Sequence, residues 1–237
     1  MKQLTTKIIV LLALAAAAMA CSKSGGEEEA YGTLRFGEIE VTRAAETDNY
    51  AVTIYAADGQ TVEEWLYGEL PAEVTLKVGE YRIGIVSGEM PDAEWESPVY
   101  SVEKEFSIEE NRTTELGTLT MKLANLKVSV TYAPELAAAL GEDCSVTVRM
   151  GGSSLEFVGQ EERAGYFKVP ESGNSLQVEF AGTVDGVEET LSATIDNVKA
   201  GEWRKINISM SFVVEEDGRT GVTIGEWVSD PEVVPGE

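Results

Sequence analysis

Leu126-Lys127-Val128-Ser129-Val130-Thr131-Tyr132 alternates apolar and polar residues along its whole length, and this stretch decides the fold class. A period of two places one row of side chains on the buried face of a β-strand and the other row in water. The same period recurs at Tyr81–Ile85 and at Val102–Ile108. Strands at this spacing predict an all-β protein built from two tandem β-sandwich domains, and not from alternating strands and helices.

Two Asp-Gly pairs mark expected β-hairpins. Asp58-Gly59 separates residues 50–56 from 61–67, and Asp185-Gly186 separates residues 176–184 from 187–195. Asp-Gly suits a tight hairpin turn because both residues tolerate a positive φ.

Two further features interrupt the strand pattern. The apolar parity switches at Gly37, which predicts a β-bulge there. Pro134–Leu140 begins with a proline, continues with Glu135 and alanines, and ends at Gly141, which predicts a helix of two turns.

A weak internal repeat supports two related domains, because Leu76–Arg82 is similar to Val198–Arg204. We place the boundary between Leu119 and Asn125, which gives two domains of ordinary size. The predicted organisation is a signal peptide at 1–20, a lipidated cysteine and flexible tether at 21–30, sandwiches at 31–121 and 122–214, and a tail at 215–237.

The N-terminus has the layout of a secretory signal. Lys2 and Lys7 precede an apolar run, Ile8–Ala18. This run is shorter than the roughly 20 residues that span a bilayer. Ala18-Met19-Ala20-Cys21 resembles a lipobox, which implies cleavage before Cys21 and a diacylglycerol on its sulfur. Such a lipid would make the membrane a permanent partner. The alternative is an ordinary secreted protein with a free N-terminal cysteine.

Composition excludes several classes of function. The formal net charge of −24 repels nucleic acid and anionic lipid. The chain contains no histidine, which removes the usual general base and the commonest transition-metal ligand. Cys144 alternates with Val146 and Val148, so it reads as a core residue, and an acylated Cys21 leaves it no disulfide partner. We therefore expect no catalytic residues and no cofactor.

Acidic residues are the remaining candidates for chemistry. Glutamate doublets occur at expected strand edges and turns, where charge keeps an edge soluble, although a pair of carboxylates for glycoside hydrolysis remains an alternative. These doublets are Glu63-Glu64, Glu109-Glu110, Glu161-Glu162 and Glu188-Glu189. Asp58-Gly59 and Glu215–Gly218 are only fragments of a calcium loop, so we predict no metal site.

Aromatic side chains are better candidates for binding, because a flat ring can stack on a sugar. Trp95 and Tyr100 lie in Gly88–Tyr100, the longest connector without a clear period, and we name them as candidate ligand-binding residues. The alternative is that both rings anchor the connector to the core.

Four phrases carry a family resemblance: Leu70–Tyr81, Trp95–Tyr100, Lys122–Val130 and Arg163–Val169. They resemble the domain-of-unknown-function 4493 lipoproteins of gut Bacteroides, over about residues 31–212. More distantly, the layout is similar to fimbrillin-like proteins, which implies transthyretin/immunoglobulin-like sandwiches. This resemblance also implies an outer-membrane lipoprotein, facing the cell exterior, that associates with fimbrial or other surface proteins.

The fimbrillin-like resemblance further implies strand exchange. Cleavage after Arg43 would remove the first strand and open an acceptor groove. Val222, Ile224 and Trp227 predict a final strand, which either folds back on 206–212 or is donated to a neighbouring subunit.

Three functional hypotheses follow. The leading one is a non-enzymatic surface lipoprotein that acts as an adhesion or fimbria-associated module. The second is an accessory protein that binds polysaccharide through Trp95, Tyr100 or nearby rings. The third is a glycosidase that uses carboxylates alone.

Overall fold

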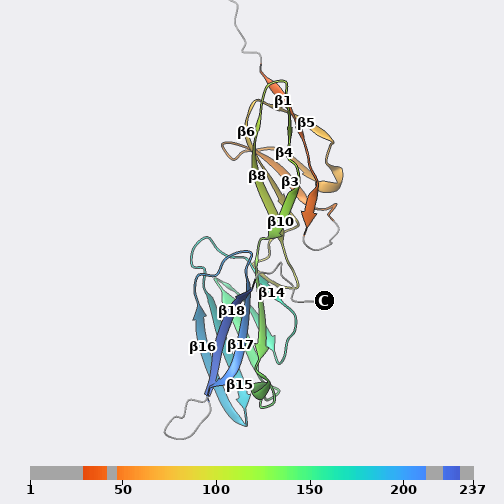
Figure 1. Ribbon diagram of the computed structural model, residues 1–237. Helices are drawn as coiled ribbons and strands as arrows, with labels where there is room; N and C mark the ends of the chain where they lie inside the picture. The colour runs from red at the N-terminus through yellow and green to blue at the C-terminus, as the bar shows by residue number, and fades with distance from the viewer. Residues whose placement is uncertain (1–28, 42–46, 212–220, 230–237) are drawn as a thin grey trace, which may run out of the picture.

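The computed structural model describes residues 29–41, 47–211 and 221–229, and these form two β-sandwiches arranged end to end (Figure 1). The all-β prediction is confirmed. Within the described ranges the helical elements are a short 3-10 turn, η1 (Tyr67–Glu69), and the helix α1 (Pro134–Ala137). No helix in these ranges is long and apolar enough to cross a membrane. Cys21 and Arg43 lie outside the described residues.

The first sandwich packs a three-stranded sheet on a six-stranded sheet around one hydrophobic core. Leu34 and Leu76 enter this core from the small sheet, and Val52, Ile83 and Met121 enter it from the large sheet. The small sheet has the order β5 (Glu73–Lys77), β1 (Tyr31–Arg35), β9 (Thr113–Glu115). The large sheet has the order β2 (Ile39–Val41), β10 (Leu119–Leu123), β8 (Tyr100–Ile108), β6 (Gly79–Val86), β3 (Ala51–Ala56), β4 (Thr61–Leu66).

The second sandwich packs a five-stranded sheet on a four-stranded sheet around a separate core. Its largest fully buried side chains include Phe157, Phe167 and Phe180, and Cys144 is fully buried beside them, as predicted. One sheet has the order β18 (Gly221–Ser229), β17 (Trp203–Ser211), β11 (Leu126–Tyr132), β14 (Gly165–Phe167), β7 (Ala93–Trp95). The other has the order β13 (Ser153–Val158), β12 (Ser145–Met150), β15 (Leu176–Val184), β16 (Val187–Ile195).

Both predicted hairpins form. Asp58-Gly59 joins β3 to β4, and Asp185-Gly186 joins β15 to β16 through the pair Val184↔Val187. Asp185 has φ 50° and Gly186 has φ 80°, so both residues adopt the positive φ that a two-residue hairpin loop of this kind requires.

The predicted β-bulge at Gly37 is instead a crossing between sheets. The strand β1 ends at Arg35 in the small sheet, and β2 begins at Ile39 in the large sheet. The chain changes its buried side because it changes sheets, and this produces the same switch of parity that a bulge would.

The predicted two-turn helix is shorter than expected. The helix α1 ends at Ala137, after one turn, because the following chain leaves the helical hydrogen-bond pattern. Ala139 N–H donates to the Leu136 carbonyl, and Leu140 forms a β-bridge with Val184. Pairing with β15 therefore replaces the second turn.

The strand β7 belongs to a sheet of the second sandwich, although the predicted domain boundary between residues 121 and 122 assigns it to the first domain. It belongs to the first half of the sequence, yet Ala93 pairs with Phe167 and Trp95 pairs with Gly165 in the five-stranded sheet. The domain bounds stay a prediction, and β7 links the two halves by strand pairing.

Candidate functional site

Trp95 packs against the second core. Its ring meets Phe157 edge to face with ring centroids 4.6 Å apart, and the guanidinium carbon of Arg163 lies 4.7 Å from the Trp95 ring centroid. Glu161 binds Arg163 through two hydrogen bonds of 2.7 and 3.0 Å, and these hold the pKa of the Glu161 carboxyl down at about 2. Glu161, Arg163 and Trp95 thus form a stack that covers the end of β7.

Tyr100 packs against the first core, so the structure does not bring the two predicted aromatic residues together in one core. Both side chains are partly buried. Their role in ligand binding stays a prediction.

A buried amide secures the chain between Trp95 and Tyr100. Asn125 has no exposed surface, and its side chain accepts a hydrogen bond from Val99 N–H at 3.3 Å and donates one to the Ser97 carbonyl at 2.9 Å. Its own carbonyl accepts from Gly201 N–H at 3.0 Å. This residue therefore ties the connector to the turn that precedes β17.

The predicted final strand is present as β18. It pairs antiparallel with β17 of the same chain, from Ser211↔Gly221 to Trp203↔Ser229. Val222 is buried in the second core and Ile224 packs against that core. Trp227 lies opposite Lys205 in the register. Donation of this strand to a neighbour stays a prediction.

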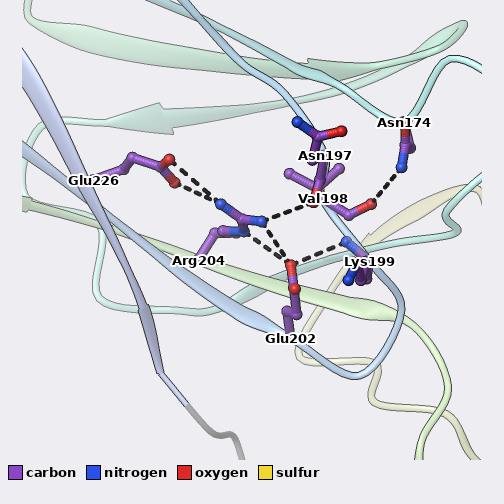
Figure 2. Close-up of polar contacts among 7 residues, drawn as sticks. All are labelled: Asn174, Asn197, Val198, Lys199, Glu202, Arg204 and Glu226. Carbon is purple, nitrogen blue, oxygen red and sulfur yellow. Dashed lines mark hydrogen bonds and ion pairs between the residues drawn. The ribbon is translucent and has the colours of Figure 1, made fainter.

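A buried arginine joins β18 to the rest of the sheet (Figure 2). Arg204 is only 6% exposed, and it donates to Glu226 of β18 at 3.0 Å and to Glu202 at 2.8 Å. It also donates to the Asn197 carbonyl at 3.0 Å. Burial works against the charged form of Arg204, but the hydrogen bonds to the two carboxylates outweigh it and raise its pKa. Arg204 and the two carboxylates therefore form ion pairs that connect β17 to β18.

Trp203 lies beside Arg204 in sequence but faces the other side of the sheet. Its indole nitrogen donates to the Ser129 hydroxyl at 2.9 Å. The ammonium nitrogens of Lys127 and Lys205 lie 3.8 and 3.9 Å from the ring centroid. Two cations are therefore held at one partly exposed aromatic ring by cation–π attraction.

Polar side chains continue along this side of the sheet. The Thr131 hydroxyl donates to Asn207 at 3.3 Å, and the Ser209 and Thr223 hydroxyls are 3.1 Å apart. We use the name outer face for the eight residues Lys127, Ser129, Thr131, Trp203, Lys205, Asn207, Ser209 and Thr223. Tyr166 of β14 and Glu94 of β7 continue the row of Lys127 on the same side of the sheet. Apolar residues such as Val128 and Ile206 alternate with them and fill the core. These eight residues form a polar surface that carries two lysines and the Trp203 ring.

Two shallow hollows contain charged residues. One, of about 320 Å³, is lined by residues that include Glu80, Tyr81, Arg82 and Glu105. The other, of about 430 Å³, lies between Asp92, Lys168 and the β12–β13 turn. Glu80 and Glu105 are both exposed, on neighbouring strands of one sheet. Among the residues with described positions, no cluster of three or more potential ligands could hold a metal ion.

A family model described as a domain of unknown function (DUF4493) matches residues 35–234. The chain belongs to this family. The match covers most of both sandwiches of the DUF4493 chain, and it confirms the resemblance found in the sequence. No curated protein matches this DUF4493 chain.

Solved structures of low sequence identity are also similar to the DUF4493 chain. The fimbrial anchor protein Mfa2 from Porphyromonas gingivalis is 12% identical with a TM-score of 0.46, over 84% of this chain and 97% of that one. A fimbrial assembly protein from Parabacteroides distasonis is 11% identical with a TM-score of 0.46, over 82% and 99% of the two chains. At this identity no residue role transfers between the proteins.

Two features of the DUF4493 chain, the outer face and the buried Arg204, were not predicted from the sequence. The outer face had a signal, because Trp203, Lys205, Asn207 and Ser209 share one parity of a strand whose other parity is apolar. Arg204 interrupts that apolar parity, and a charged residue at a core position indicates a buried ion pair. Its partner Glu226 could not be read from the sequence, because the register between β17 and β18 had to be known.

Proposed function

We propose that this protein is a non-catalytic, lipid-anchored protein of the bacterial outer membrane that works at the cell surface as an adhesion or fimbria-associated module. It holds its second sandwich away from the membrane and contacts surface polymers or other surface proteins there.

The direction of the chain carries this proposal. The strand β1 begins at the end of the first sandwich that is remote from the second sandwich (Figure 1). A lipid on Cys21, ten residues before Tyr31, would hold the molecule at that end. The second sandwich, with its outer face, is then the part furthest from the membrane.

The chemistry of the side chains supports a binding role over a catalytic one. Histidine is absent from the sequence, and Cys144 is buried, where burial raises the pKa of its thiol. The carboxylates in the hollow beside Tyr81 are open to water. A general acid at neutral pH needs a raised pKa, which usually comes from burial.

Strand donation is a separate part of the proposal. Release of β18 to a neighbouring subunit would break its pairing with β17 and the Arg204–Glu226 ion pair. Cleavage after Arg43 would be the step that opens an acceptor site. Incubation with an arginine-specific protease, followed by size-exclusion chromatography, tests both steps, and a protein that stays monomeric after cleavage contradicts them.

Adherence of living cells tests the main proposal. Cells that carry the protein should adhere to immobilised mucin, polysaccharides or purified fimbriae better than cells from which its gene is deleted. Complementation with the wild-type gene should restore adherence. Equal adherence of all three strains on every surface would contradict an adhesive role.

A further inference from the structure

We propose that the free edge of β16 is a homophilic binding site, which pairs antiparallel with β16 of a second copy of this chain carried by a neighbouring cell. This inference rests on the proposed function, because it names a partner and a surface through which the adhesion module would join two cells.

The strand β16 is a long and regular edge strand. It lies at the edge of its four-stranded sheet, and among the described residues only β15 pairs with it. All nine of its residues pair with β15 without a register shift, and Val184↔Val187 closes the hairpin. Hydrogen-bonded residues alternate from Val187 onward, so every second residue directs its backbone N–H and C=O groups to the free edge. These residues are Glu188, Thr190, Ser192 and Thr194.

The other sheet edges are less suited to pairing with a further strand. The strands β2, β7 and β9 have three residues each, and β5 and β13 have five and six. The strand β4 carries Glu63-Glu64, and its register with β3 shifts at Ile54/Tyr55. Charges and irregular pairing both protect an edge from association. The strand β18 is as long as β16, but Gly225 at its centre has no side chain to pack on a partner.

The charges of β16 favour antiparallel pairing with an identical strand. A two-fold axis at Leu191 would bring together the residues whose backbone groups point to the free edge, and no acidic residue would face another. Parallel pairing in register would instead place Glu188 beside Glu188 and Glu189 beside Glu189, and like charges at facing positions are unfavourable. The pairs in the antiparallel register are Glu188 with Thr194, Glu189 with Ala193, and Thr190 with Ser192.

The direction of β16 determines how the two copies would be arranged. The strand begins after the Asp185-Gly186 turn, at the end of the second sandwich that is remote from the first, and runs toward the first sandwich (Figure 1). Antiparallel pairing would therefore set the two second sandwiches side by side, with the two first sandwiches extending in opposite directions. The lipids that we propose on Cys21 would then lie at opposite ends of the pair, so the pair would connect two membranes.

Net charge should make each single contact weak. The formal net charge of −24 makes two copies repel each other at long range, and added salt should screen this repulsion and strengthen the pairing. Weak pairing is sufficient for adhesion, because many copies on two facing cells bind together and their contacts multiply.

Introduced cysteines test the register. Facing residues without mutual hydrogen bonds have Cα atoms about 4.5 Å apart, which a disulfide can bridge. Leu191→Cys should therefore give disulfide-linked dimers when the mature protein with Cys21→Ser is mildly oxidised. Ala193→Cys is the control, since it would face Glu189 and should give few dimers. Equal cross-linking of the two variants, or none in a folded Leu191→Cys protein, would overturn the proposed pairing.

Substitutions at Thr194 test the charge complementarity. Thr194→Lys places a lysine opposite Glu188 at two symmetric positions, and it should strengthen dimerisation about two- to tenfold, whereas Thr194→Glu should weaken it by a similar factor. Thr120→Lys and Thr120→Glu make the same charge changes at an exposed position of β10, and should have effects within about twofold. Sedimentation equilibrium at several salt concentrations measures the dimer. A wild-type protein that stays monomeric up to about 1 mM, or equal effects at the two positions, contradicts the inference.

Mixed cell populations separate this inference from the proposed function. Two differently stained populations that both carry the protein should form mixed clumps, and cells with Thr194→Glu should form fewer. Equal clumping with cells that lack the gene would show that the partner is not a second copy. If cells adhere to immobilised surfaces but do not clump, this inference fails and the proposed function stands. If they clump but adhere to no surface, this inference stands and the proposed contact with surface polymers fails.

Discussion

At the scale of single residues, Arg204 shows how this sheet tolerates a charge in its interior. Burying a guanidinium is costly unless hydrogen bonds compensate for the lost water. Glu202, Glu226 and the Asn197 carbonyl supply them, and the two carboxylates keep partial contact with solvent, at 22% and 34% side-chain exposure. The ion pair is therefore a link between β17 and β18 that depends on geometry as well as charge.

Replacing this arginine should be costly. Arg204→Met leaves two carboxylates side by side without their partner, and we expect a loss of about 2–3 kcal/mol in the free energy of unfolding. Urea unfolding monitored by circular dichroism measures it. Arg149→Met is the matched control, because Arg149 pairs with Glu179 at the surface and should lose less than about 1 kcal/mol. Equal losses in the two variants would show that burial of Arg204 is unimportant.

Glu161 gives a prediction about pH. Its pKa of about 2 in the folded protein lies below the ordinary value of 4.5, because of the hydrogen bonds from Arg163. A depressed pKa means that the contact stabilises the fold above about pH 4.5, and that this contribution disappears as the pH falls toward 2. Titration followed by carboxyl chemical shifts should show Glu161 ionised at pH 3, and in Arg163→Gln its midpoint should return toward 4.5. An unchanged midpoint in the variant would refute the assigned cause.

Among the elements of the fold, two chain segments run side by side as they pass from one sheet of the first sandwich to the other. The segment from β1 to β2 runs beside the segment from β9 to β10, and both strand pairs are parallel. A Cβ atom added at Gly37 would lie 1.6 Å from the Gly117 carbonyl oxygen. The two segments can approach each other only because Gly37 has no side chain.

A methyl group at this crossing should therefore be poorly tolerated. Gly37→Ala must displace backbone atoms, and we expect a loss of about 3 kcal/mol or more, up to failure to fold. Gly152→Ala is the control, because its added Cβ meets no atom within 4 Å and its effect should stay within about 0.5 kcal/mol. Thermal and urea unfolding of both variants compare them. A Gly37→Ala protein as stable as wild type would contradict the close crossing.

Substitutions in the strand β7 can distinguish a packing role of Trp95 from a role in ligand binding. Trp95→Ala removes the contacts with Phe157 and Arg163, and it should reduce the free energy of unfolding by about 2–4 kcal/mol. Glu94→Ala, on the opposite face of the same strand, should change it by less than about 0.5 kcal/mol. If Trp95→Ala unfolds like wild type but no longer binds a polysaccharide, Trp95 is a ligand contact and not a packing residue.

The sequence predicted the elements better than their partners. The alternation of apolar and polar residues located β11 and the β15–β16 hairpin, because a strand that is buried on one side has apolar residues at every second position. The position of β7 and the crossing at Gly37 were missed, since each depends on contacts with residues far away in the chain. The outer face was missed for the same reason, because Trp203 gains its meaning from Lys127 on a neighbouring strand.

Across the molecule as a whole, the two sandwiches have separate cores. The strand β7, which comes from the first half of the sequence, nevertheless belongs to a sheet of the second sandwich. The strand β7 and the buried Asn125 connect them at the junction, through pairing with β14 and hydrogen bonds to Ser97 and Val99. Such a junction resists bending more than a flexible linker would, because a strand pairing and a buried amide must break for the sandwiches to separate. With the lipid anchor that we propose, this junction would hold the second sandwich away from the membrane.

The location of the second sandwich on living cells is the most direct test of the proposed function. Antibodies against residues 126–211 are applied to intact cells that express wild-type protein or Cys21→Ser, and bound antibody is measured by flow cytometry. We predict strong labelling of intact wild-type cells and loss of labelling for Cys21→Ser, although the variant is still exported and folded. Labelling of wild-type cells only after the outer membrane is permeabilised, or undiminished labelling of Cys21→Ser, would contradict a surface protein held by its lipid.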